Sequence, residues 1–212
     1  MRILAPLAAL TIATAAHAAP VNFADGWREQ RLSLFSSNDY SFGESLQMVS
    51  DGSVSIAWSR VDRSDWDKRR ASWVWQVDQG VPPTDLGQKG GDDRNISIYF
   101  VFLPQDQAEA LANANIRRLM GNDQVRILQY AWGGNHSVGE VIMSPYGPPG
   151  QGATIALRPA STGVFREAVD LSADYARAFG GSPDALVGLA VSGDSDDTES
   201  FIRAAIAELV LE

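Results

Sequence analysis

Two aspartate-rich segments carry the side chains best suited to chemistry in this chain of 212 residues. They are residues 90–93 (Gly-Gly-Asp-Asp) and 193–198 (Gly-Asp-Ser-Asp-Asp-Thr), and each adjoins an apolar, strand-like run. Backbone pairing of those strands would hold the carboxylates at fixed positions. Carboxylate oxygens are the ligands that Ca²⁺ prefers, but aspartates also cap turns by accepting hydrogen bonds from backbone N–H groups. The residues leave both interpretations open.

The second segment has the composition of a short calcium-binding loop. It differs from an EF-hand, because the glycine and the closing glutamate of that loop are absent. The first segment either contributes to the same site or ends a glycine-rich turn. Calcium is the one cofactor that these residues suggest, and its candidate ligands are Asp194, Asp196, Asp197 and Thr198.

Chemistry based on cysteine or histidine has little material in this chain. There is no cysteine, and the two histidines are His17 and His136. His136 lies in a loop, where it acts either as a general base or metal ligand or as a solvated side chain. A zinc site usually draws on several such residues. No nucleophile elbow, P-loop or dinucleotide fingerprint is present. A glycosidase carboxylate pair stays open, because the aspartate segments can supply two acids.

Aromatic side chains are the second resource for binding. The six tryptophans can include a platform for sugar rings, whose C–H faces pack on aromatic faces. Trp66 lies in the charged stretch 62–70 and is therefore expected to be exposed. Trp73 and Trp75 alternate with Val74, which is typical of core-facing strand residues. The candidate ligand-binding residues are Trp66, Asp92, Asp93, Trp132 and His136.

The first residues are typical of a secretory signal. Arg2 precedes a short apolar stretch, and Ala16-His17-Ala18 matches a cleavage site. The stretch is too short for a membrane span of roughly 20 apolar residues. We therefore expect a signal peptide over residues 1–18 and one mature domain over 19–212, periplasmic or secreted and not inserted in a membrane.

The composition limits the partners and the means of stabilisation. A formal net charge of −9 without a basic patch argues against nucleic acid and anionic lipid. Because an exported chain without cysteine cannot form disulfides, packing must hold the fold, with or without a bound ion.

Short apolar runs between turn signals predict an all-β protein. Residues 46–49 and 53–58 flank Asp51-Gly52 and predict a hairpin. Residues 96–103 are apolar on both faces, as in a central strand covered on both sides. The other predicted strands are 73–77, 125–132, 138–143, 154–157 and 186–191.

Helical spacing predicts two helices, over residues 105–120 and 172–179. The C-terminal segment, residues 201–211, is ambiguous. Its Ala, Glu and Leu content favours a helix. Alternation instead places Ala205, Ala207, Leu209 and Leu211 on one face of a strand.

Several motifs recur together in one known family. They are, in chain order, SWVW (72–75), KGGDD (89–93), IYFVF (98–102), QYAW (129–132), SVG (137–139), the segment 170–180, and GLAVSGDSDDT (188–198). With them the chain resembles bacterial domain of unknown function family 3047. The resemblance implies a jelly-roll, galactose-binding-like antiparallel β-sandwich with one or two short helices. It also implies a closing strand, so we predict a strand over residues 201–211.

The sequence therefore predicts a non-catalytic, exported β-sandwich that binds a glycan or another ligand of the cell envelope. Two alternatives stay open. One is a saccharide-active enzyme, a glycosidase or lyase that uses the aspartate segments. The other is a structural or protein-interaction module of the envelope.

Cleavage after Ala18 gives the first testable prediction. N-terminal sequencing of the protein from a periplasmic extract should start at Ala19, because Ala16-His17-Ala18 satisfies the small-residue rule for cleavage. A chain that keeps Met1 and fractionates with membranes would contradict the signal-peptide assignment.

Overall fold

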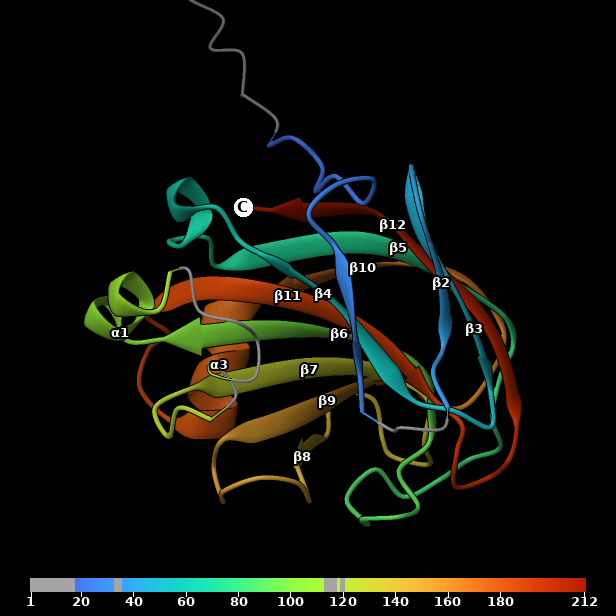
Figure 1. Ribbon diagram of the computed structural model, residues 1–212. Coiled ribbons are helices and arrows are strands. Elements are labelled where there is room, and N and C mark those ends of the chain that lie inside the picture. Colours follow the sequence, from blue (N-terminus) through green and yellow to red (C-terminus); the bar gives the residue numbers. More distant parts are fainter. Residues whose placement is uncertain (1–17, 33–35, 113–117, 119–120) are drawn as a thin grey trace, which may run out of the picture.

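The protein folds into two β-sheets that pack face to face (Figure 1). The computed structural model describes residues 18–32, 36–112, 118 and 121–212. The predicted signal peptide lies almost entirely outside the described residues. Within them, no helix is long and apolar enough to cross a membrane.

The larger sheet has seven strands and the smaller one has five. In order across the larger sheet they are β1 (Arg28–Arg31), β4 (Ser55–Arg60), β11 (Ala185–Asp194), β6 (Arg94–Leu103), β7 (Arg126–Trp132), β9 (Gly152–Arg158) and β8 (Val141–Met143). In order across the smaller sheet they are β10 (Gly163–Asp170), β5 (Arg70–Gln79), β12 (Phe201–Leu211), β3 (Ser45–Asp51) and β2 (Asp39–Phe42).

The mainly-β sandwich predicted from the sequence is confirmed. Successive strands from β3 to β6 alternate between the two sheets, as they do in sandwiches built by long crossing connections. One pairing departs from the predicted antiparallel arrangement, since β7 and β9 run parallel. Three strands gave no sequence signal that we recognised: β1, β2 and β10.

The predicted hairpin around Gly52 is wrong. β3 pairs with β12 and β2, whereas β4 pairs with β1 and β11, so the two strands belong to opposite sheets. A buried serine cluster holds the corner between β3 and β4. Ser50 Oγ donates to the carbonyl oxygen of Ser53 at 2.7 Å and bonds Ser195 Oγ at 2.8 Å. These bonds tie the corner to the loop after β11.

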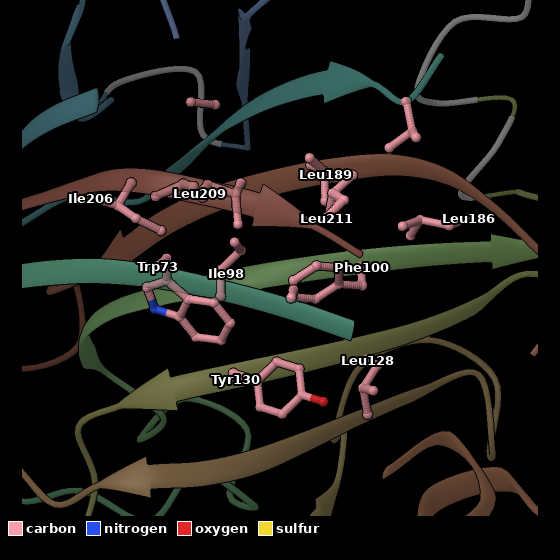
Figure 2. Close-up of a cluster of buried hydrophobic side chains, with 14 of the residues drawn as sticks. Trp73, Ile98, Phe100, Leu128, Tyr130, Leu186, Leu189, Ile206, Leu209 and Leu211 are labelled. Carbon is pink, nitrogen blue, oxygen red and sulfur yellow. The ribbon is translucent and has the colours of Figure 1, made fainter. Parts of the chain in front are cut away.

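Aromatic and aliphatic side chains fill the space between the sheets (Figure 2). Trp73 and Trp75 of β5 are fully buried, as their alternation predicted. Their rings lie 5.4 Å apart and almost perpendicular. Across the core, Trp73 contacts Tyr130 at 5.8 Å, and Trp75 contacts Trp132 at 5.6 Å between ring centroids. These aromatic contacts join β5 of the smaller sheet to β7 of the larger one.

The C-terminal segment is a strand, as the resemblance implied. Its core-facing residues change parity along the strand: Ile202 and Ile206 are buried before Glu208, and Leu209 and Leu211 after it. The cause is a β-bulge, seen as a register shift against β5 and as a φ of 52° at Glu208. The predicted inward face is therefore right only beyond the bulge.

Two α-helices complete the described fold, together with a short 3₁₀ turn η1 (Arg63–Asp65). α1 (Gln105–Ala110) ends much earlier than the predicted helix 105–120, because Leu111 leaves helical geometry at φ −105° and ψ 9°. Residues 113–117 and 119–120 lie outside the described residues. α3 (Leu171–Phe179) confirms the second prediction, with the Asp170 side chain accepting from Ala173 N at its start.

Truncating Trp73 should unfold a large part of the population. Trp73→Ala removes a fully buried indole and should lower the free energy of unfolding by about 3–5 kcal/mol. Trp73→Phe should cost less, because the indole Nε1 has no hydrogen-bond partner among the described residues. Urea denaturation followed by circular dichroism measures both. Phe42→Ala, on an exposed ring of β2, is the control and should change stability little.

Candidate functional site

The fold brings the two aspartate-rich segments together. Residues 90–93 lead into the start of β6, and residues 193–198 comprise the last two residues of β11 and the loop that follows it. β6 and β11 are antiparallel neighbours, and Arg94 and Asp194 face each other in the register. Gly193 makes a close approach here, because an added Cβ would lie 2.9 Å from the backbone carbonyl oxygen of Asn95. The strand register therefore sets the position of every acid in the site.

A buried arginine links the two segments. Arg94 Nη1 donates to Asp92 Oδ2 at 3.2 Å and to Asp194 Oδ2 at 3.1 Å. Its Nη2 donates to Tyr99 Oη at 2.8 Å, and Tyr99 Oη bonds Ser192 Oγ at 2.9 Å. The side chains of all three charged residues are about nine-tenths buried. Such a pair of ion pairs is costly to desolvate and therefore needs this full set of bonds.

A tyrosine from another loop completes the network. Tyr146 Oη donates to Asp92 Oδ1 at 2.7 Å, so both oxygens of Asp92 are bonded. Burial and this bond raise the pKa of Tyr146 to about 12. Two buried polar atoms of this network have no partner among the described residues: Arg94 Nε and Asp194 Oδ1.

This network forms one end of a pocket of about 510 Å³ on the outer face of the larger sheet. One cross-strand row of pocket residues runs Trp58, Ala190, Tyr99, Gln129 and Thr154, from β4 to β9. β11 contributes the small residue Ala190 to this row, and a hollow therefore remains between the larger side chains of Trp58 and Tyr99.

A second row makes the pocket more apolar toward its other end. It consists of Gly188, Val101, Ile127 and Gly152, again in register across the strands. The pocket thus has an apolar wall and floor at one end and fixed charges at the other. This combination is typical of small-ligand sites.

Opposing effects act on the carboxyl group of Asp194. Burial raises its pKa, Arg94 lowers it, and the neighbouring Asp196 and Asp93 raise it again, so that the net shift is upward. Burial lowers the pKa of Arg94, but Tyr99, Asp194 and Asp92 outweigh that effect and raise it. Arg94 is therefore charged throughout the usual pH range, whereas Asp194 is held toward its neutral form.

Asp93 caps the loop that follows β11. It is fully buried, and its carboxylate accepts from Asp197 N at 3.3 Å and from Thr198 N at 2.7 Å. Thr198 Oγ1 donates to it at 2.5 Å. Asp196 and Asp197 are exposed, and one oxygen of each lies within 4.8 Å of the others and of Asp93. The four predicted metal ligands are thus divided, since Asp194 Oδ2 faces Arg94 and Thr198 donates to Asp93.

The two tryptophans expected to contact a ligand lie elsewhere. Trp66 is only 8% exposed, and its Nε1 donates to the carbonyl oxygen of Val61 at 3.0 Å. The expectation that Trp66 is exposed is wrong, because the charged neighbours point outward while the indole packs inward. Trp132 is fully buried in the core. Neither residue lines the pocket.

His136 has both ring nitrogens engaged in its loop. Leu86 N donates to Nε2 at 3.0 Å, and Nδ1 contacts Glu140 Oε1 at 3.0 Å. These partners require the neutral tautomer with its proton on Nδ1. His136 therefore anchors the loop 84–86 and does not line the pocket. Of the five predicted ligand-binding residues, Asp92 is the one that lines the pocket.

Comparison with known families is consistent with this architecture. The family described as "Protein of unknown function (DUF3047)" matches residues 25–210. The chain belongs to this family.

No curated protein matches this DUF3047 chain. Among solved structures, it is similar to the xyloglucanase domain of NopAA, a type three effector from Sinorhizobium fredii, in complex with cellobiose. The two share 10% sequence identity with a TM-score of 0.47, over 93% of this chain and 97% of the other.

The raised pKa of Asp194 predicts a pH dependence of stability. The folded state binds the Asp194 proton more tightly than the unfolded state does. The free energy of unfolding therefore falls as pH rises from the ordinary aspartate pKa, near 4, to the pKa in the folded state. Asp194→Asn removes that titration. The melting temperature of the wild type should therefore fall relative to the variant as pH rises.

Thermal melts from pH 4.5 to 9 measure this difference. The control is Asp123→Asn, an exposed acid beyond the opposite end of β6, which should leave the pH profile unchanged. If instead the melting temperature of the wild type rose relative to that of Asp194→Asn with rising pH, the bond to Arg94 would outweigh the effect of burial on Asp194.

Proposed function

We propose that this DUF3047 protein is an exported, non-catalytic binding protein that holds a glycan of the cell envelope on the outer face of its larger sheet. The proposal rests on one observation: the same pocket has an apolar wall and, next to it, a charged edge held in place by hydrogen bonds. Sugars have the same two-sided chemistry, with C–H faces and hydroxyl edges.

The apolar wall supplies the packing surface. Trp58 and Ile56 of β4 stand on one side of the hollow, and Val101 and Ile127 stand on the other. The wall is more aliphatic than aromatic, which favours a glycan with an apolar substituent, such as an alkyl or acyl glycoside. A free monosaccharide would leave most of this surface uncovered.

The charged edge supplies orientation. Hydroxyl groups both donate and accept, so they can bond carboxylates and a guanidinium at the same time. Asp92, Arg94 and Asp194 are held by one another and by Tyr99 and Tyr146, and little reordering is needed when a ligand binds. An acidic edge also disfavours anionic ligands, in agreement with the chain's net charge of −9.

Export would bring the protein to ligands of the envelope. The Ala16-His17-Ala18 motif, a match to a signal-peptide cleavage site, supports export.

One observation favours a second function, hydrolysis or elimination at a glycosidic bond. Asp92 and Asp194 bond the same Arg94 nitrogen, and burial holds the pKa of Asp194 above its usual range. Glycosidases use two carboxyl groups beside a pocket, and the pKa of the one that acts as general acid is raised. In that case Asp194 would be the general acid and Asp92 the base or nucleophile.

Titration calorimetry with alkyl glycosides and the parent free sugars tests the binding proposal. We expect the alkyl glycosides to bind more tightly than the free sugars, because they cover the aliphatic wall. Trp58→Ala should weaken binding about tenfold or more. Phe42→Ala, an exposed aromatic on the other sheet, is the matched control and should bind as the wild type does.

A reducing-end assay on the same glycosides separates the two functions. Binding without product supports the binding protein. Product that depends on Asp194, lost in Asp194→Asn, identifies an enzyme. If no glycoside binds and none is cleaved, the glycan proposal is wrong.

A further inference from the structure

Five carboxyl groups meet at the junction of β6 and β11. They belong to Asp92, Asp93, Asp194, Asp196 and Asp197, and Arg94 is the one cation that forms salt bridges with them in the described part of the chain. Arg94 serves Asp92 and Asp194, so Asp196 and Asp197 have no such counter-charge.

The geometry of three of these acids suits a single ion. One oxygen each from Asp93, Asp196 and Asp197 lies within 4.8 Å of the other two. Two oxygens bound to one Ca²⁺ at 2.3–2.6 Å are at most about 5 Å apart. Asp93 is fixed by its bonds to the loop, whereas the other two side chains are exposed and open to an ion from solvent.

A second observation at Asp194 points to the same place. Asp194 is only 8% exposed, and its Oδ1 has no partner within the described residues. Asp194 ends β11 and lies two residues before Asp196, so this oxygen is buried at the place where the other acids gather. A buried carboxylate oxygen without a donor needs a proton or a cation beside it.

We propose that Asp93, Asp196 and Asp197 bind a divalent cation of the calcium type, next to the buried carboxyl group of Asp194, which has one unpaired oxygen. The cation satisfies the acids that Arg94 does not reach and fixes the loop 194–198 against the start of β6. Loop carbonyl groups and water complete the 6–8 oxygen ligands that Ca²⁺ takes.

Calcium suits this site better than magnesium. The ligands come from two segments, and the exposed carboxylates at 196 and 197 are free to be mono- or bidentate. Mg²⁺ demands a tight octahedron near 2.0–2.1 Å and keeps several of its waters. Since Asp196 also lines the pocket, the ion would border the ligand site, but the proposal does not depend on the ligand.

The test uses CaCl₂ alone, with the mature wild-type protein and the double variant Asp196→Asn/Asp197→Asn. At free Ca²⁺ near 100 times its dissociation constant, the wild type should melt about 5–10 °C higher than in EDTA. The same concentration of Mg²⁺ should give a smaller rise. Titration calorimetry should give one site per chain.

The double variant tells a cation apart from a proton. In EDTA it should melt at or above the wild type, because repulsion among the acids is relieved, and Ca²⁺ should no longer raise its melting temperature. Asp123→Asn should keep the full response. A wild type with identical melts in EDTA and Ca²⁺, or a double variant that keeps the Ca²⁺ response, overturns the proposal.

Discussion

The burial of one guanidinium group constrains the rest of the site. Arg94 opens the central strand β6, and its charge is taken out of water between Asp92 and Asp194. Removing the Asp92 carboxylate would leave a buried charge short of a partner, which is strongly destabilising. The β6–β11 register, the close approach at Gly193 and the hydroxyl groups of Tyr99 and Ser192 all keep the two acids at this position. The arginine therefore determines where the aspartate segments can lie.

The sandwich makes this arrangement possible because the chain crosses between its sheets beside the site. Ser50 and Ser53 form the corner between β3 and β4, and both bond Ser195 in the aspartate loop. Asn38 adds a bond from its side-chain nitrogen to the carbonyl oxygen of Gly193 at 2.9 Å. A buried polar cluster of this kind stabilises only when nearly every member is satisfied. Here it ties the loop to both sheets, so the acids are mounted on the rigid frame of the sandwich.

Local patterns in the sequence predicted the strands and their inward faces well where alternation is regular, as at Trp73 and Trp75. They failed where tertiary contacts decide. The Asp51-Gly52 pair has the chemistry of a hairpin turn, yet the chain crosses to the other sheet at a corner held by the serine cluster. The bulge at Glu208 reverses the inward face of β12 without a signal in the composition. For the site, the two aspartate segments were recognisable, but Arg94, Tyr99 and Tyr146 were missed, because their meeting depends on strand order and register. The one available signal was a charge, Arg94, at the start of an apolar strand.

The sequence pattern of β6 also explains why the pocket was not predicted. Residues 96–103 are apolar on both faces, which predicted a strand covered on both sides. The structure covers one face with the aromatic core and leaves Tyr99 and Val101 half-buried on the other. The small residues Gly188 and Ala190 on the neighbouring strand keep that second face hollow. Uncovered apolar surface on a sheet is unfavourable in water unless something packs on it. The pocket therefore lies where β6, which is apolar on both faces, runs beside the small residues Gly188 and Ala190 of β11.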